Sequence, residues 1–105
     1  MNFTILEKMS ILKALDEVLL ADGNIHRREV TYLNQVMDIF DVDMDFVSES
    51  RNLNSAHASS TLKSMDSVKK GALGVMLKEM ASADGEIGMK ELDVMFAVLD
   101  AAGIK

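Results

Sequence analysis

The sequence of 105 residues contains no cysteine and no proline, and its aromatic residues are four phenylalanines and one tyrosine. The absence of cysteine excludes disulfide bonds, thiolate catalysis and cysteine-ligated zinc. No apolar run approaches the roughly 20 residues that cross a bilayer. Acidic residues and lysines interrupt the apolar residues at the N-terminus, which is not the pattern of a signal peptide. We therefore expect a soluble, cytoplasmic protein without direct insertion into a membrane.

Positive charge is also scarce. Eleven Lys and Arg residues stand against seventeen Asp and Glu residues, which gives a formal net charge of −6. Nucleic acid is not an expected partner, because its binding depends largely on Lys and Arg contacts to phosphate. An acidic chain instead favours cations or basic partners. The sequence has no glycine-rich phosphate loop, zinc-protease helix or nucleophile elbow, so we expect no enzymatic activity.

Two nine-residue segments are near copies of each other: ADGNIHRRE at residues 21–29 and ADGEIGMKE at residues 83–91. The offset of 62 positions holds without a gap, and eight of twenty-four positions are identical between residues 17–40 and 79–102. The hydrophobic pattern continues where the identity stops. A repeat of this kind predicts two equivalent helix–turn–helix units.

Apolar residues at steps of three and four predict amphipathic helices over residues 3–21, from about 26 to 40, 66–83 and 88–102. Asp-Gly ends the first helix of each unit, and Asp66 is a plausible N-cap. We expect one all-α domain over residues 1–105, a helical bundle with repeat halves at about 3–40 and 66–102 related by a pseudo-twofold axis. The apolar stripes expected to face the core are Ile5, Met9, Leu12, Leu15 and Leu19; Val30, Leu33, Val36, Met37 and Phe40; Val68, Ala72, Val75, Met76 and Met80; and Leu92, Met95, Phe96 and Leu99.

The linker, about residues 41–65, is expected to be less regular. The run DVDMDF alternates as a strand does, but strands are depleted in aspartate. We predict a turn there, with Asp43 or Asp45 capping a short helix up to about Leu53. The serine-rich stretch NLNSAHASS predicts a flexible loop with at most a weak helical turn. His57 lies in this stretch and is expected to be solvated.

The repeated turn has a purely structural interpretation. Ile25 and Ile87 would tuck under the turn as apolar plugs. Glu29 and Glu91, at the third helical position, would reach back to the cap's backbone amide as in a capping box. This interpretation explains every repeated residue of the loop without a ligand. It is weakened only because neither cap position carries Ser or Thr.

The same residues also suggest a cation site. The spacing DGxIxxxE matches the second half of a calcium-binding EF-hand loop. The first half is missing, because Val18 and Leu20 stand where that loop needs oxygen ligands, as do Met80 and Ser82 in the other copy. We therefore reject an EF-hand. Two turns related by a pseudo-twofold axis could instead pool their carboxylates around one divalent cation, calcium, magnesium, manganese or zinc. The candidate ligands are Asp22, Glu29, Asp84 and Glu91, with Glu17 and Glu79 as possible extensions of the cluster.

The pair of ADGxIxxxE segments about sixty residues apart, each flanked by helices, resembles the signature of the TerB-like family of tellurite-resistance and stress-associated domains. A related domain begins a membrane-linked DnaJ co-chaperone. The resemblance implies an all-helical fold with internal twofold pseudo-symmetry, a metal-binding role for the four carboxylates, and membrane-associated multiprotein systems as a setting. This sequence departs from the family at His26 and Gly88, where Ser or Thr is common. Because tellurite is an anion, any resistance role would be indirect.

Two hypotheses follow. The first is a non-enzymatic stress-type domain that binds a divalent cation through the repeated carboxylates. The alternative is a protein-interaction module that contacts an unidentified partner through a methionine-rich or acidic surface, with the turns as helix-capping structure only. Carboxylate oxygens within about 5 Å of a common point would favour the first. His26 could supply a nitrogen ligand, but we interpret it as a surface residue at a helix start.

Overall fold

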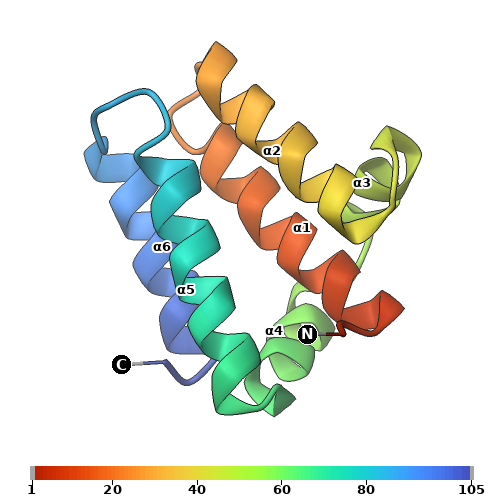
Figure 1. Ribbon diagram of the computed structural model, residues 1–105. Coiled ribbons are helices and arrows are strands. Elements are labelled where there is room, and N and C mark those ends of the chain that lie inside the picture. Colours follow the sequence, from red (N-terminus) through yellow and green to blue (C-terminus); the bar gives the residue numbers. More distant parts are fainter. Residues whose placement is uncertain (1, 105) are drawn as a thin grey trace.

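Six helices make up the described part of the chain, residues 2–104 of the computed structural model, and no strand occurs within it. Helices α1 and α2 form one hairpin, α5 and α6 form a second, and α3 and α4 connect the two (Figure 1). Both hairpin turns lie at the same end of the bundle. The all-α prediction is therefore confirmed. The helices are α1 (Ile5–Leu20), α2 (Arg27–Phe40), α3 (Met44–Ser50), α4 (Ser55–Ser64), α5 (Ser67–Ala81) and α6 (Met89–Ala101).

Helix α1 is the centre of the core, since it packs against each of the other five helices. Its start is fixed by a capping box in which the Thr4 hydroxyl accepts from the Glu7 amide and the Glu7 carboxylate accepts from the Thr4 amide. Ile11, Leu12 and Leu15 of this helix are completely buried. Burial of each such side chain contributes about 1.5–3 kcal/mol, so α1 supplies much of the hydrophobic stabilisation.

Two predicted N-caps are confirmed. The Asp43 carboxylate accepts a hydrogen bond of 3.1 Å from the amide of Phe46 and begins α3, which settles the choice between Asp43 and Asp45. The Asp66 carboxylate accepts one of 2.9 Å from the amide of Lys69 and begins α5. In both cases the side chain satisfies an amide that has no partner within the helix.

The prediction of a loop over the serine-rich stretch is wrong. Helix α4 occupies most of it, capped by the Asn54 side chain. Ala58 and Leu62 of α4 are buried, and the helix packs on α1 and α6. Two buried apolar residues in a ten-residue helix are too few to produce a clear period. His57 is exposed, but in the first turn of α4 rather than in a loop.

The predicted core face of α5 is wrong in part. Met80 is fully buried as predicted, but Val68 and Val75 are exposed, whereas Leu73 and Leu77, which the predicted stripe omitted, are fully buried. Apolar residues and glycines occur on several faces of α5, so their spacing in the sequence does not identify the buried face. Other members of the predicted stripes, Ile5 and Phe96, are likewise exposed. No helix among residues 2–104 combines the length and apolar character needed to cross a bilayer.

The corrected face of α5 can be tested by paired substitutions. We expect Leu15→Ala and Leu77→Ala each to lower the free energy of unfolding by about 2–5 kcal/mol, because both remove a fully buried side chain. Val75→Ala, at a position 57% exposed, should change it by about 0.5 kcal/mol or less. Urea unfolding followed by circular dichroism measures all three. A cost for Val75→Ala equal to that of Leu77→Ala would contradict the arrangement.

Candidate functional site

Each hairpin turn is closed in the same way. The glycine after each aspartate has a positive φ, 78° at Gly23 and 96° at Gly85, a region that residues with a side chain rarely occupy. The aspartate Oδ1 accepts a hydrogen bond from the amide two residues on, at 2.9 Å for Asp22 and 3.2 Å for Asp84. The turn therefore uses one carboxylate oxygen of each aspartate and leaves Oδ2 for other contacts.

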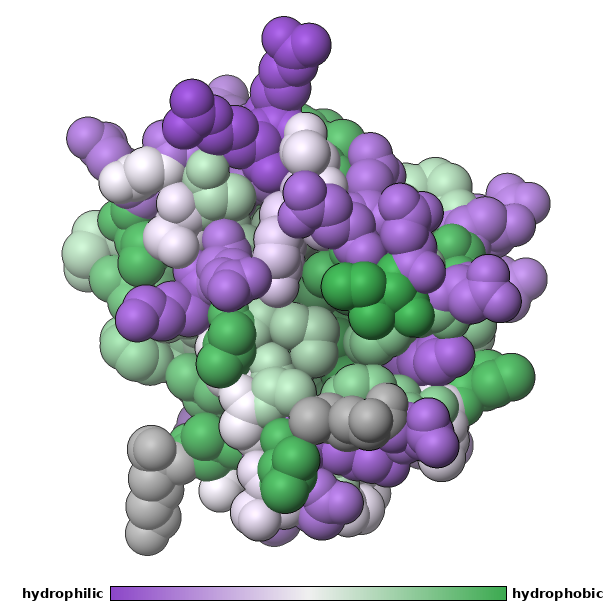
Figure 2. Space-filling model, viewed as in Figure 1, coloured by the Kyte–Doolittle hydropathy of each residue, from purple (hydrophilic) through white to green (hydrophobic). Residues whose placement is uncertain are grey.

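The isoleucines of the repeated turns do not fill the predicted role. Ile25 is 65% exposed and Ile87 is 37% exposed, so neither is an apolar plug. The turns are held by the aspartate hydrogen bonds and the left-handed glycines. The end of the bundle that carries the turns is mostly hydrophilic on the face seen in Figure 2.

Glu29 and Glu91 occupy the third positions of α2 and α6, and they are 0% and 2% exposed. Both oxygens of Glu29 and the Oε2 atom of Glu91 are buried without a hydrogen-bond partner among the described residues. The predicted capping box at Glu29 is therefore wrong, since its oxygens do not accept from the amide of His26. The repeated glutamates point inward and remain available to a ligand.

Burying carboxylates without hydrogen-bond partners raises the free energy of the folded state. Most buried polar groups in proteins are hydrogen-bonded, and a buried charge without compensation costs several kcal/mol. The same chain shows the usual solution at Asp16, which is equally buried but receives two hydrogen bonds of 2.8 and 2.9 Å from the Arg51 guanidinium. No Lys or Arg forms an ion pair with Glu29 or Glu91 within the described residues. Bound protons or a bound cation would therefore lower the free energy of this pair of glutamates.

The imidazole of His26 lies between the two turns. Its Nε2 atom is 3.2 Å from Asp22 Oδ2 and 3.9 Å from Glu29 Oε1, and its Nδ1 atom is 3.5 Å from Asp84 Oδ2. The first two contacts lie within the α1–α2 hairpin. The third crosses to the α5–α6 hairpin, so one side chain links the turns of both halves.

The donor atoms form two overlapping groups. In one, atoms of Asp22, His26 and Glu91 lie within 4.8 Å of one another; in the other, atoms of His26, Glu29 and Asp84 do so. Each group combines residues from both hairpins. Each group holds two of the four repeated carboxylates, and all four lie around the imidazole of His26, which belongs to both groups.

The interpretation of His26 as a surface residue at a helix start is incomplete. Its side chain is only one-third exposed, and it faces the cluster rather than solvent alone. The repeat concealed this role, because the equivalent position is Gly88. A Cβ atom at Gly88 would lie 3.2 Å from Glu91 Oε1, which is a tight contact. A side chain there would require Glu91 to shift by a few tenths of an ångström, and a single imidazole contacts both turns.

The electrostatics of the cluster follow from its burial and its excess of acid. Burial, followed by the neighbouring Glu91, raises the pKa of Glu29 to about 8. The hydrogen bond to Asp22 raises the pKa of His26. The pKa of Asp22 is lowered, first by the backbone hydrogen bond within the turn and then by His26. Without another cation, the cluster takes up protons to offset its own negative charge.

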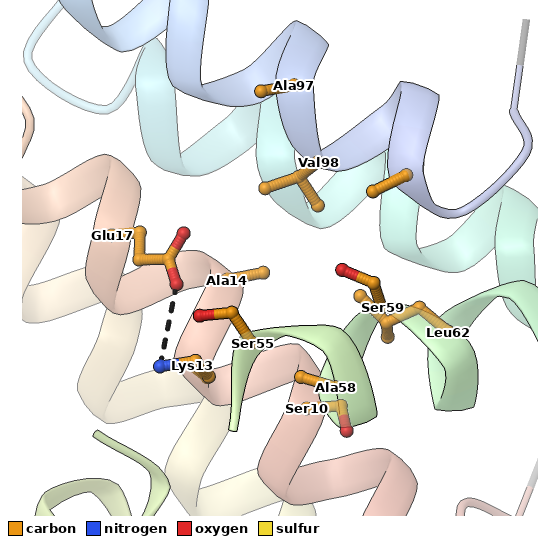
Figure 3. Close-up of a pocket in the computed structure, with 11 residues that line it drawn as sticks. Ser10, Lys13, Ala14, Glu17, Ser55, Ala58, Ser59, Leu62, Ala97 and Val98 are labelled. Carbon is orange, nitrogen blue, oxygen red and sulfur yellow. Dashed lines mark ion pairs between the residues drawn. The ribbon is translucent and has the colours of Figure 1, made fainter. Parts of the chain in front are cut away.

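Glu17 and Glu79, the suggested extensions of the cluster, lie outside both donor groups. Glu17 pairs with Lys13 at 3.7 Å and lines a groove of about 200 Å³ between α1, α4 and α6 (Figure 3). Glu79 is exposed on α5. The pKa of Tyr32 is raised first by the burial of Tyr32 and second by its neighbour Glu79. The other residues that line the groove are mostly small: Ser10, Ala14, Ser55, Ala58, Ser59, Leu62, Ala97, Val98 and Ala101.

No protein-family model matches the chain, and no curated protein matches it. Among solved structures, a protein of unknown function from Porphyromonas gingivalis is similar over 100% of this chain and 88% of its own, with a TM-score of 0.79 and 24% sequence identity. At this level of identity the likeness shows the fold alone. The fold is thus shared with a protein of divergent sequence.

The pKa shifts predict how the stability of the metal-free protein depends on pH. In the folded state, Glu29 and His26 hold protons more tightly than in the unfolded state. The free energy of unfolding should therefore fall as pH rises from about 5 to about 8. Asp22 has a lowered pKa, and its stabilising contribution is complete above about pH 5. Glu29→Gln should flatten the dependence, because the amide does not titrate.

Urea unfolding in EDTA at pH 5 and pH 8 measures this effect. Glu17→Gln is the matched control, since Glu17 lies outside the cluster, and it should retain the wild-type dependence. A Glu29→Gln protein with an undiminished loss of stability between the two pH values would contradict the electrostatic account.

Proposed function

We propose that the protein is a non-enzymatic, TerB-like domain that binds a divalent cation through Asp22, Glu29, Asp84 and Glu91. One observation carries the proposal: both oxygens of Glu29 and Oε2 of Glu91 are buried without a hydrogen-bond partner among the described residues, and each glutamate lies in a donor group with the aspartate of the other turn. An acidic cluster on the surface would not suffice, because exposed carboxylates are solvated by water. A buried carboxylate without a partner is stabilised when a cation binds.

The turns are suited to this task. In each, Oδ1 of the aspartate is committed to the backbone, which fixes the direction of Oδ2. The glutamate is fixed by the first turn of the following helix. A bound ion would connect the starts of α2 and α6, which belong to different hairpins. Binding would displace the protons held by Glu29 and His26, so cation affinity should increase with pH.

The resemblance to the TerB-like family suggests a cytoplasmic role in stress or tellurite resistance. The cluster is anionic and should repel tellurite, so we infer that such a role would act through the bound cation or through a partner protein. The alternative is a protein-interaction module in which the turns are structure only. The exposed side chains of Ile25 and Ile87 favour the interaction module, because they give each turn an equivalent apolar group that a partner protein could contact.

Thermal unfolding distinguishes the two functions. If the cluster binds a cation, the melting temperature of EDTA-treated protein should rise saturably when calcium, magnesium, manganese or zinc is added. At about 100 times the Kd, the rise should be about 10–20 °C for a domain of this size. Glu29→Gln combined with Glu91→Gln should abolish the rise, whereas Glu17→Gln should retain it. A wild-type protein that none of the four metals stabilises would sink the cation-binding proposal and favour the interaction module.

A further inference from the structure

The candidate ligand set is asymmetric in its chemistry. Four carboxylates come in equivalent pairs from the two turns, but the imidazole comes from the first turn alone. Both ring nitrogens of His26 face carboxylate oxygens, at distances from 3.2 to 3.9 Å. The cluster therefore offers one nitrogen donor among oxygen donors, and this difference bears on which cation it selects.

We propose that His26 is a metal ligand and that the site prefers a late first-row transition-metal ion, such as zinc, to calcium or magnesium. This inference rests on the proposed function, because it names the class of ion for the same site. Imidazole nitrogen suits zinc, copper, iron and nickel, whereas calcium and magnesium take oxygen ligands almost exclusively. The imidazole lies at a position in the cluster where a calcium ion would need a further oxygen ligand.

The contact between His26 and Asp22 fits compact coordination. With metal–ligand distances of about 2.0–2.2 Å, neighbouring donors around a tetrahedral zinc ion lie about 3.4 Å apart. The Nε2 atom is 3.2 Å from Asp22 Oδ2, so this edge of the ring faces one candidate oxygen ligand at nearly that spacing. Glu29 Oε1 is farther, at 3.9 Å, and belongs to the other donor group. We assign Nε2 as the ligand atom on this ground.

The other edge of the ring supports the same assignment. Nδ1 lies 3.5 Å from Asp84 Oδ2, in the second hairpin. A histidine that binds a metal through one nitrogen commonly donates its other N–H to a carboxylate, which orients the ring and makes the ligand more basic. Asp84 is placed to accept from Nδ1 in this way. The role of Asp84 therefore changes from a direct ligand to a positioning residue for His26, and Asp22, Glu29 and Glu91 remain the carboxylate ligands.

A competing account uses the same contacts without a metal. Protonated His26 could itself be the cation that offsets the carboxylates, with the imidazolium in place of a bound ion. The two accounts differ in what happens when the imidazole is removed. A nitrogen ligand is lost in the first, and affinity for zinc falls; an internal cation is lost in the second, and affinity for any divalent cation rises.

Calorimetric titration of EDTA-treated protein with zinc, calcium and magnesium tests the proposal. We expect the wild type to bind zinc at least about 100-fold more tightly than calcium or magnesium. His26→Asn removes the imidazole but keeps a favourable N-cap for α2, so the protein should fold. It should lose zinc affinity by about 10–100-fold and leave calcium and magnesium affinity nearly unchanged. His57→Asn is the matched control, because His57 is exposed on α4, and it should behave as the wild type.

Cobalt gives a direct signature of the ligand. In wild-type protein loaded with cobalt, the proton NMR spectrum should contain a strongly shifted, exchangeable resonance from the imidazole N–H, and His26→Asn should lack it. Circular dichroism of each variant establishes that the protein is folded.

The outcomes separate the two proposals. If His26→Asn keeps the wild-type preference for zinc while Glu29→Gln weakens every metal, the nitrogen ligand is overturned and the cation site stands. If His26→Asn binds divalent cations more tightly than the wild type, His26 is an internal cation and the ligand assignment is overturned. If the wild type binds none of the three metals, both proposals fail.

Discussion

The candidate site depends on two buried glutamates, Glu29 and Glu91, at one end of the bundle. Both oxygens of Glu29 and one of Glu91 have no hydrogen-bond partner among the described residues. Each glutamate sits at the third position of a helix that begins immediately after a repeated turn, and each is withdrawn from solvent. The helix starts orient favourable backbone dipoles towards them, but neither oxygen of Glu29 has a hydrogen-bond partner among residues 2–104. The cluster can lower its free energy by binding protons or by binding a cation. Because Glu29 and Glu91 come from different hairpins, either solution acts on the contact between the two halves.

The fold accounts for how this cluster is assembled. Helix α1 packs against every other helix and holds the two hairpins in fixed relation. The glycines with positive φ turn the chain back sharply, and the turn aspartates anchor to the backbone through one oxygen only. Asp16, buried but paired with Arg51, shows that this chain neutralises a structural carboxylate with its own cation. Among residues 2–104 neither glutamate of the turns pairs with Lys or Arg, and Glu29 has only the imidazole of His26 at 3.9 Å.

Much of this arrangement could be predicted from the sequence, because a repeat reports equivalent positions directly. The offset of 62 residues identified both turns and all four carboxylates, and helical periodicity identified α1, α2, α5 and α6. Features that break the repeat were harder to predict. His26 has only Gly88 as its counterpart, α4 buries just Ala58 and Leu62, and α5 carries apolar residues on all sides. The inward direction of Glu29 could not be predicted either, because capping and burial use the same residue at the same helical position.

The most direct test of a cation shared by both turns is an amide NMR titration of metal-free protein with manganese. Paramagnetic broadening falls steeply with distance, so a shared ion should broaden the amides of Gly23 and Gly85 together at substoichiometric metal, and leave the distant amides of α3 sharp. Glu29→Gln combined with Glu91→Gln should remove the effect. Broadening at only one turn, or spread over the whole acidic surface, would contradict a shared buried site.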